Sequence, residues 1–151
     1  MRILALDIAT KCGWAYKDKR IKSGTIDLKK DTHFDGAGVV FLKFERWLQR
    51  FLEADLIIVE GVIKQDGGQI AQQRRYGGLL AIVQKFGDKH SIPYTAEGVS
   101  TIKKFWTGSG KASKELMVET AREKGFNPRD DNEADALALL HLAIDLYEDL
   151  L

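Results

Sequence analysis

The chain begins with short apolar runs of strand length. Residues 2–8 predict a buried strand, and residues 12–17 and 20–28 predict two more, separated by short polar turns. Because no helix fits between these segments, the three strands should pair as an antiparallel meander. Later apolar runs at 55–60 and 91–96 predict a fourth strand and a short fifth one.

Helical spacing of apolar residues fills most of the remaining chain. It occurs in five segments: 32–53, 69–89, 99–106, 113–124 and 132–150. Gly77 and Gly78 lie inside the second segment, and each weakens a helix by roughly 1 kcal/mol relative to alanine. They therefore indicate a close approach of another element, or a kink. The order βββαβαβααα predicts an α/β fold with a mixed sheet and helices on its faces.

Composition is typical of one compact domain spanning residues 1–151. The chain is 44% hydrophobic, has two prolines and contains no low-complexity stretch. Cys12 is the single cysteine, so no intrachain disulfide can form and a reducing compartment is expected. The opening apolar run is too short for a signal peptide, and no segment approaches membrane-spanning length. We expect a soluble, cytoplasmic protein with no membrane partner.

Charge is segregated along the chain although the formal net charge is only +1. Residues 64–129 hold 12 Lys and Arg against 6 Asp and Glu, whereas residues 130–151 hold 7 acids and no Lys or Arg. Such segregation predicts a basic rim around an acidic centre. A blander interpretation is that the final acids only solvate a surface helix.

Three carboxylate sources stand out against this pattern. Asp7 and Glu60 each end an apolar strand, and Asp135 lies among alanine and leucine near the start of the last helix. Carboxylates converging from separate elements can hold two Mg²⁺ ions roughly 3.5–4 Å apart, an arrangement that hydrolyses phosphodiesters. This requires the first and fourth strands to be neighbours, with the last helix lying over their ends.

Each acid also has an ordinary structural interpretation. Asp7 could be a turn residue, and Glu60 could pair with a buried arginine. Asp130, Asp131 and Glu133 are acids of the kind favoured in the first turn of a helix, with Asp131 a candidate N-cap. Asp135 is harder to explain in this way because apolar residues surround it.

The segments Leu4-Ala5-Leu6-Asp7, Ile57-Ile58-Val59-Glu60 and Asn132-Glu133-Ala134-Asp135-Ala136-Leu137-Ala138 resemble the RuvC-like Holliday junction resolvases. The similarity spans nearly the whole chain and looks closest to the phage and poxvirus branch; a phage-encoded protein would act in the host cytoplasm. It implies a ribonuclease H-like fold with a five-stranded mixed sheet flanked by helices. It further implies a homodimer that nicks symmetric strands of four-way or branched DNA using Mg²⁺ or Mn²⁺.

The chain departs from this family at Asn132, where relatives often carry an aspartate three residues before the helix aspartate. An amide carbonyl can bind a hard cation but brings no charge, so this metal should bind more weakly unless Asp131 compensates. The resemblance therefore implies Asp7, Glu60 and Asp135 as metal ligands and catalytic residues, with Asp131 or Asn132 as the fourth ligand.

Basic residues form the expected DNA-binding set. Lys103, Lys104, Lys111 and Lys114 lie in the region that leads into the helix expected over 113–124, where lysines and glycine backbone can approach phosphates. The family carries functionally important lysines in this region, which makes Lys111 and Lys114 candidates for a catalytic role as well. The alternative interpretation is that these lysines are only solvated residues at the start of a helix. Three further candidates for DNA contact follow the fourth strand: Ile63, Arg74 and Arg75. Ile63 could equally be a core residue, and the two arginines could instead belong to the dimer interface.

Three rival functions remain open. Sugar kinases and actin-like ATPases also begin with an apolar strand ending in Asp, as in Asp7-Ile8-Ala9-Thr10, but they need a second domain that 151 residues cannot supply. A ribonuclease H-like nuclease could act on other branched DNA or on RNA. A weakened metal site could also leave a protein that binds junctions without cutting them.

Overall fold

The computed structural model describes residues 1–61 and 70–150. In this part of the chain, five strands form one sheet in the order β3-β2-β1-β4-β5. The strands are β1 Ile3–Asp7, β2 Lys11–Lys17, β3 Ile21–Asp27, β4 Leu56–Glu60 and β5 Tyr94–Glu97. β1, β2 and β3 form the predicted antiparallel meander, and β4 and β5 extend it in parallel to β1. The predicted five-stranded mixed sheet is confirmed.

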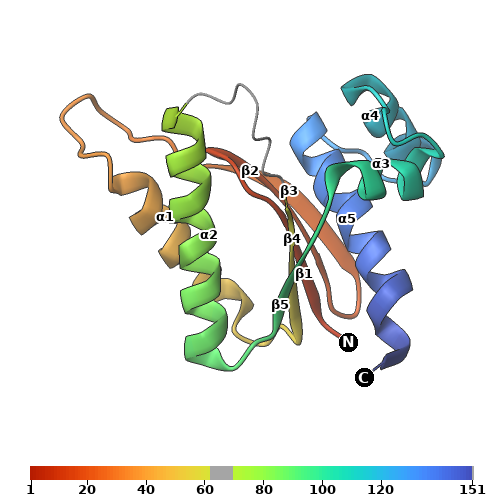
Figure 1. Cartoon of the computed structure of the whole chain (residues 1–151), viewed down its shortest axis with the longest axis horizontal. Coiled ribbons are helices and arrows are strands. Elements are labelled where there is room, and N and C mark those ends of the chain that lie inside the picture. Colours follow the sequence, from red (N-terminus) through yellow and green to blue (C-terminus); the bar gives the residue numbers. More distant parts are fainter. Residues whose placement is uncertain (62–69, 151) are drawn as a thin grey trace.

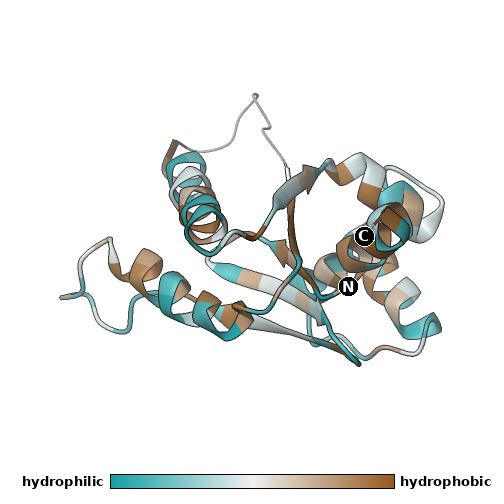
Figure 2. Ribbon diagram, turned by 90° about the horizontal axis from the view of Figure 1, so that it is seen from below, coloured by the Kyte–Doolittle hydropathy of each residue, from teal (hydrophilic) through white to brown (hydrophobic). Residues whose placement is uncertain are grey.

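Helices cover both faces of this sheet, as Figures 1 and 2 show from two directions. The helices are α1 Val39–Leu48, α2 Ile70–His90, α3 Val99–Thr107, α4 Lys114–Glu123 and α5 Asp131–Tyr147, with short 3₁₀ turns at Gln49–Phe51 and Glu148–Leu150. One apolar core lies between the sheet and α1 with α2, and a second lies between the sheet and α3, α4 and α5. The predicted element order is confirmed.

Helix α5 is the central support of the second core. It is apolar on almost every side because β1 and β2 pack on one side of it and α3 and α4 on the other. Its buried residues include Ala134, Leu137 and Leu140. A helix that is hydrophobic all round is stable only when it is enclosed in this way. The acidic residues of α5 therefore stay at its two ends.

Two predicted boundaries were wrong for physical reasons. The helix expected over 32–53 forms only from Val39, after Gly36 and Gly38, where backbone entropy opposes an earlier start. The strand expected over 91–96 begins at Tyr94, because Ser91 and Ile92 form the turn that closes α2 after His90. Ser91 adopts a left-handed backbone with φ of 56°, and the Ile92 N–H donates to the Gly87 carbonyl at 2.8 Å, closing the helix.

The predicted close approach at the glycine pair is confirmed at Gly78. A Cβ placed there would lie 2.4 Å from the ring of Phe41, so the glycine lets α1 pack directly onto α2. No helix in the part of the chain described is long and apolar enough to cross a membrane.

Candidate metal centre at the strand ends

Asp7 and Glu60 lie side by side because β1 and β4 are adjacent parallel strands. Leu6 is in register with Val59, so the next residue on each strand carries its carboxyl group at the same edge of the sheet. Side chains alternate between the two faces of a strand. Ala5 and Ile58 pack against α5, and Asp7 and Glu60, two residues further on, point to that same face. The predicted neighbourhood of these strands is confirmed.

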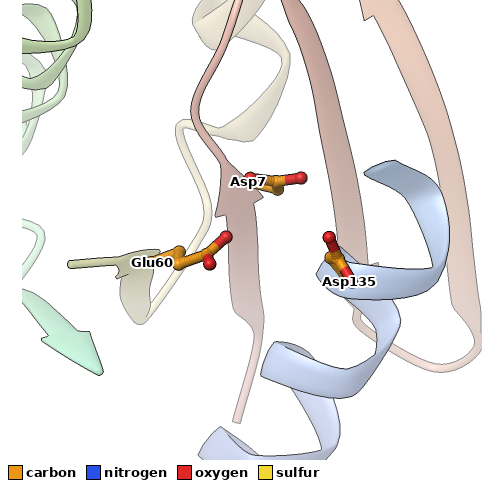
Figure 3. Close-up of side chains that lie close together, drawn as sticks. All are labelled: Asp7, Glu60 and Asp135. Atoms are coloured by element: carbon orange, nitrogen blue, oxygen red, sulfur yellow. The ribbon is translucent and has the colours of Figure 1, made fainter. Parts of the chain in front are cut away.

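Asp135 completes a carboxylate cluster with Asp7 and Glu60. It lies in the first turns of α5, over the ends of the two strands. One carboxylate oxygen from each residue lies within 4.8 Å of the others, and Figure 3 shows the three groups pointing toward a common space. A hard divalent cation takes carboxylate oxygens at 2.0–2.6 Å, so one ion between them could contact all three.

The start of α5 is fixed by Asp130. Its Oδ1 accepts hydrogen bonds from the Glu133 N–H at 2.8 Å and from the Thr25 hydroxyl of β3 at 2.7 Å. Glu133 reaches back to accept from the Arg129 N–H at 2.9 Å. The suggestion that Asp131 caps this helix was therefore wrong. Asp130 is the cap because only its carboxylate also accepts a hydrogen bond from the sheet.

A glycine on β2 brings the same helix close to the sheet. A Cβ at Gly13 would lie 1.9 Å from the backbone oxygen of Asn132, a separation that no real side chain tolerates. Gly13 is also the register partner of Asp7. The main chain of Asn132 therefore packs directly against β2, at the residue paired with Asp7 of β1.

Burial and the crowding of carboxylates raise the pKa values of Asp7 and Asp135. Burial raises the pKa of Asp7 well above its ordinary value, and the neighbouring carboxyl groups of Glu60 and Asp135 raise it further. Burial, followed by repulsion from Glu60 and Asp131, raises the pKa of Asp135 from 3.8 to about 7. Among the described residues, none of the three cluster carboxylates forms a salt bridge with a basic side chain. This donor set fits a divalent cation, which would neutralise the charges that now repel one another.

The two candidates for a fourth ligand lie at the rim of the cluster. Asp131 is one turn before Asp135, and its charge helps to raise the pKa of both Asp135 and Asp7. Its Oδ2 also lies 3.7 Å from the Lys114 ammonium. Asn132 lies next to Asp131, against Gly13. Whether Asp131 or Asn132 is a ligand stays a prediction.

The structure divides the predicted basic residues into two groups. Lys103 and Lys114 lie near enough to Asp135 for their charges to lower its pKa in part. Lys104, on α3, and Lys111, just before α4, are exposed. The second group is on α2, where Arg74 and Arg75 are both exposed. The prediction for Ile63 lies outside the described residues.

Several supporting residues were not anticipated from the sequence. The spacing Asp130-x-x-Glu133 is a capping-box pattern and could have identified the start of α5. Gly13 and Thr25 give no such signal, because their partners are more than 100 positions away. Tyr76 was also not anticipated; its hydroxyl donates to the Glu60 carbonyl, 16 positions earlier, at 2.8 Å and secures the end of β4 against α2.

No protein-family model matches the chain, and no curated protein matches its sequence. Solved structures do. Thermus thermophilus RuvC superposes with a TM-score of 0.71 at 21% sequence identity, covering 99% of this chain and 96% of that one. The chain shares its fold. T. thermophilus RuvC in complex with a Holliday junction substrate gives a TM-score of 0.74 at 21% identity with the same coverage. Ydc2, the yeast mitochondrial Holliday junction resolvase, gives 0.62 at 11% identity, covering 99% of this chain and 82% of that one. The ribonuclease H-like fold expected from the sequence is confirmed.

Proposed function

We propose that this protein is a structure-specific endonuclease that resolves four-way and branched DNA junctions by metal-dependent phosphodiester hydrolysis. The observation that carries the proposal is the cluster of Asp7, Glu60 and Asp135 on a fold shared with RuvC. One of the matching structures is RuvC bound to a Holliday junction substrate. The proposal treats residues 1–151 as one catalytic domain that acts in the cytoplasm.

The proposed ligands are Asp7, Glu60 and Asp135, with Asp131 or Asn132 completing the set. When bound there, a pair of Mg²⁺ or Mn²⁺ ions supplies positive charge for the attacking and leaving oxygens of the phosphodiester. The chain itself contributes the placement of the carboxylates. Asp130 and Gly13 hold α5 close to the sheet, so Asp135 meets Asp7 without a search through other geometries.

The lysines at α3 and α4 would bind the substrate backbone. A polyanion approaching three crowded carboxylates is repelled by them, and Lys103 and Lys114 offset this negative field next to Asp135. Lys111 is exposed two residues before the Ser113 cap of α4, where it can reach a phosphate. Phosphate contacts of this kind position the strand without reading its sequence.

Symmetric cutting of a junction requires two active sites, so we propose a homodimer. We further propose that the protein belongs to the phage and poxvirus branch of these resolvases, on the strength of the segments around Asp7, Glu60 and Asp135. Light scattering of the purified protein tests the first point. A mass near twice 17.0 kDa is expected, and a monomer that still makes paired nicks would refute the dimer.

The function itself is tested with end-labelled four-way junctions, flaps, linear duplexes and RNA–DNA hybrids, each incubated with protein and Mg²⁺. Paired nicks at symmetric positions of the junction, absent from the linear duplex, are expected. Asp7→Asn should abolish cutting and leave junction binding largely intact, because the phosphate contacts do not need this carboxylate. Asp145→Asn, an exposed acid further along α5, is the matched control and should cut normally.

Other outcomes of this assay point to the rival functions. Preferential cutting of flaps or hybrids would indicate a ribonuclease H-like nuclease with another substrate. Tight junction binding without cutting, in either Mg²⁺ or Mn²⁺, would indicate a junction-binding protein.

A further inference from the structure

A groove of about 360 Å³ begins directly beyond Asp7. One wall is the turn between β1 and β2, from Ile8 to Lys11, and the other is the first part of α2, with Gln72, Arg75 and Tyr76. This groove, which we call the Thr10–Arg75 groove, lies on the α2 side of the strand ends. The lysines of α3 and α4 lie on the α5 side.

The groove and the carboxylate cluster are formed by the same two strand ends. Ile8, which lines the groove, follows Asp7 in the chain, and Tyr76, which lines the opposite wall, donates its hydroxyl to the Glu60 carbonyl at 2.8 Å. The two strand ends that carry Asp7 and Glu60 are therefore the border between cluster and groove. A nucleic-acid strand lying across this border would pass from the carboxylate cluster into the groove without a break.

The polar lining of the groove is suited to an anion. Lys11 and Arg75 are exposed, and within residues 1–61 and 70–150 neither forms a salt bridge with a carboxylate. Thr10 and Gln72 add a hydroxyl and an amide, and none of the described residues that line the cavity is acidic. Cations that served only to balance the acidic cluster would be expected to pair with it, and these two do not.

Arg75 is also held in place. Its Nη1 donates to the Thr10 hydroxyl at 3.0 Å, which ties α2 to the β1–β2 turn across the groove. One hydrogen bond uses one of the five guanidinium N–H donors, so the rest of the fork can bind a phosphate. A surface arginine that is only solvated has no fixed side-chain orientation. The hydrogen bond to Thr10 therefore distinguishes Arg75 from its neighbour Arg74.

We propose that the Thr10–Arg75 groove binds a phosphodiester of the cleaved DNA strand next to the scissile one, with Lys11 and Arg75 as its phosphate ligands. This inference rests on the proposed nuclease function and assigns to the strand a path over the sheet edge. The scissile phosphate lies at the carboxylates, with Lys103 and Lys114 on one side of it and Lys11 and Arg75 on the other. The phosphates on both sides of the scissile one then face basic residues, and only the reacting phosphate faces acidic side chains.

The first test is junction binding in EDTA as a function of salt. Loss of one phosphate contact lowers the slope of log affinity against log salt by about 0.9, which at 0.1 M salt corresponds to roughly eightfold weaker binding. Lys11→Ala and Arg75→Ala should each show this loss. Lys19→Ala removes another exposed lysine, in the turn at the far end of β2, and should show none. Thr10→Val removes the tie to Arg75 while keeping both charges, so a loss as large as that of Arg75→Ala would mean that turn geometry, not phosphate binding, is responsible.

The second test replaces single phosphates of the cleaved strand with neutral methylphosphonates. On wild-type protein, substitution at one position adjacent to the cut should slow cleavage. On the Lys11→Ala Arg75→Ala double variant, the same substitution should cause little further loss, because its partners are already gone. If the wild type cuts junctions and the double variant binds, cuts and responds to methylphosphonates as the wild type does, the groove is not a subsite. A wild type that cuts no junction refutes the proposed function instead.

Discussion

Replacing Asp135 with asparagine should stabilise the metal-free protein above neutral pH. Burial, Glu60 and Asp131 raise the pKa of Asp135 from 3.8 to about 7. The folded state therefore holds this proton more tightly than the unfolded state, and stability falls as the pH rises from about 4 to about 7. Each tenfold change in proton affinity is worth about 1.4 kcal/mol, which sets an upper limit of about 4 kcal/mol for the cost at pH 8. Asparagine has nearly the same shape and no charge.

Solvent screening makes the measurable gain smaller than this limit. Asp135 is partly exposed, so we expect the variant to be about 1–3 kcal/mol more stable than the wild type at pH 8. The measurement is urea unfolding in EDTA at pH 5 and pH 8. The wild type should lose stability between these values, and Asp135→Asn should lose less. Asp7 keeps its own raised pKa in the variant, so part of the pH dependence should remain.

Two controls separate this electrostatic effect from others. Asp145→Asn changes an exposed acid on the same helix and should leave unfolding nearly unchanged. Adding Mg²⁺ should stabilise the wild type more than Asp135→Asn, because a ligand of the native state alone shifts the unfolding equilibrium. An Asp135→Asn protein that is less stable than the wild type at pH 8 in EDTA would refute the reasoning, since it would mean that the carboxylate is favourably bound in the fold.

Three further predictions concern the surroundings of the cluster. Gly13→Ala places a methyl 1.9 Å from the Asn132 carbonyl, so urea unfolding should show a loss of about 3 kcal/mol or more, and cleavage should fall with it. Asn132→Asp should lower the Mg²⁺ concentration for half-maximal cutting and Asp131→Asn should raise it; unchanged titrations in both would leave Asp7, Glu60 and Asp135 as a sufficient set. Burial lowers the pKa of His141, so its protonation should destabilise the fold as the pH falls below about 6.5. Unfolding of His141→Gln between pH 7 and pH 5 should lack this decline.

The residues of the site could be predicted from the sequence where a short local pattern determines their position. Asp7 and Glu60 each end a run of buried apolar residues, and that pattern alone places a carboxylate at the end of a buried strand. Their adjacency depends on strand order, which we predicted because a shared metal site requires it and which the pairing of β1 with β4 confirms. Asp135 was evident as an acid among apolar helix residues.

The features that the sequence did not predict correctly depend on contacts between distant segments of the chain. Asp130 and Asp131 are consecutive acids before the same helix, and either could cap it by local rules. The choice is made by the hydroxyl of Thr25, 105 positions away, which donates to Asp130 alone. The Thr10–Arg75 groove likewise joins a turn to a helix 65 positions later. Neither the periodicity of apolar residues nor the spacing of a motif predicts a contact between residues so far apart in the sequence.

The proposed activity and the expected instability of the metal-free protein have the same structural origin. A cation that paired directly with Asp7 or Asp135 would lower the pKa of that group and stabilise the fold, but it would occupy the space in which the carboxylates could hold a metal. In the described residues, the nearest such contact stops one turn short, between Lys114 and Asp131. Above neutral pH the carboxylates therefore carry charges that no basic side chain balances, at a cost in free energy that protonation or a bound divalent ion would relieve. For this reason the same substitution, Asp135→Asn, should abolish cleavage and stabilise the metal-free protein. Natural selection for stability alone would not keep the aspartate.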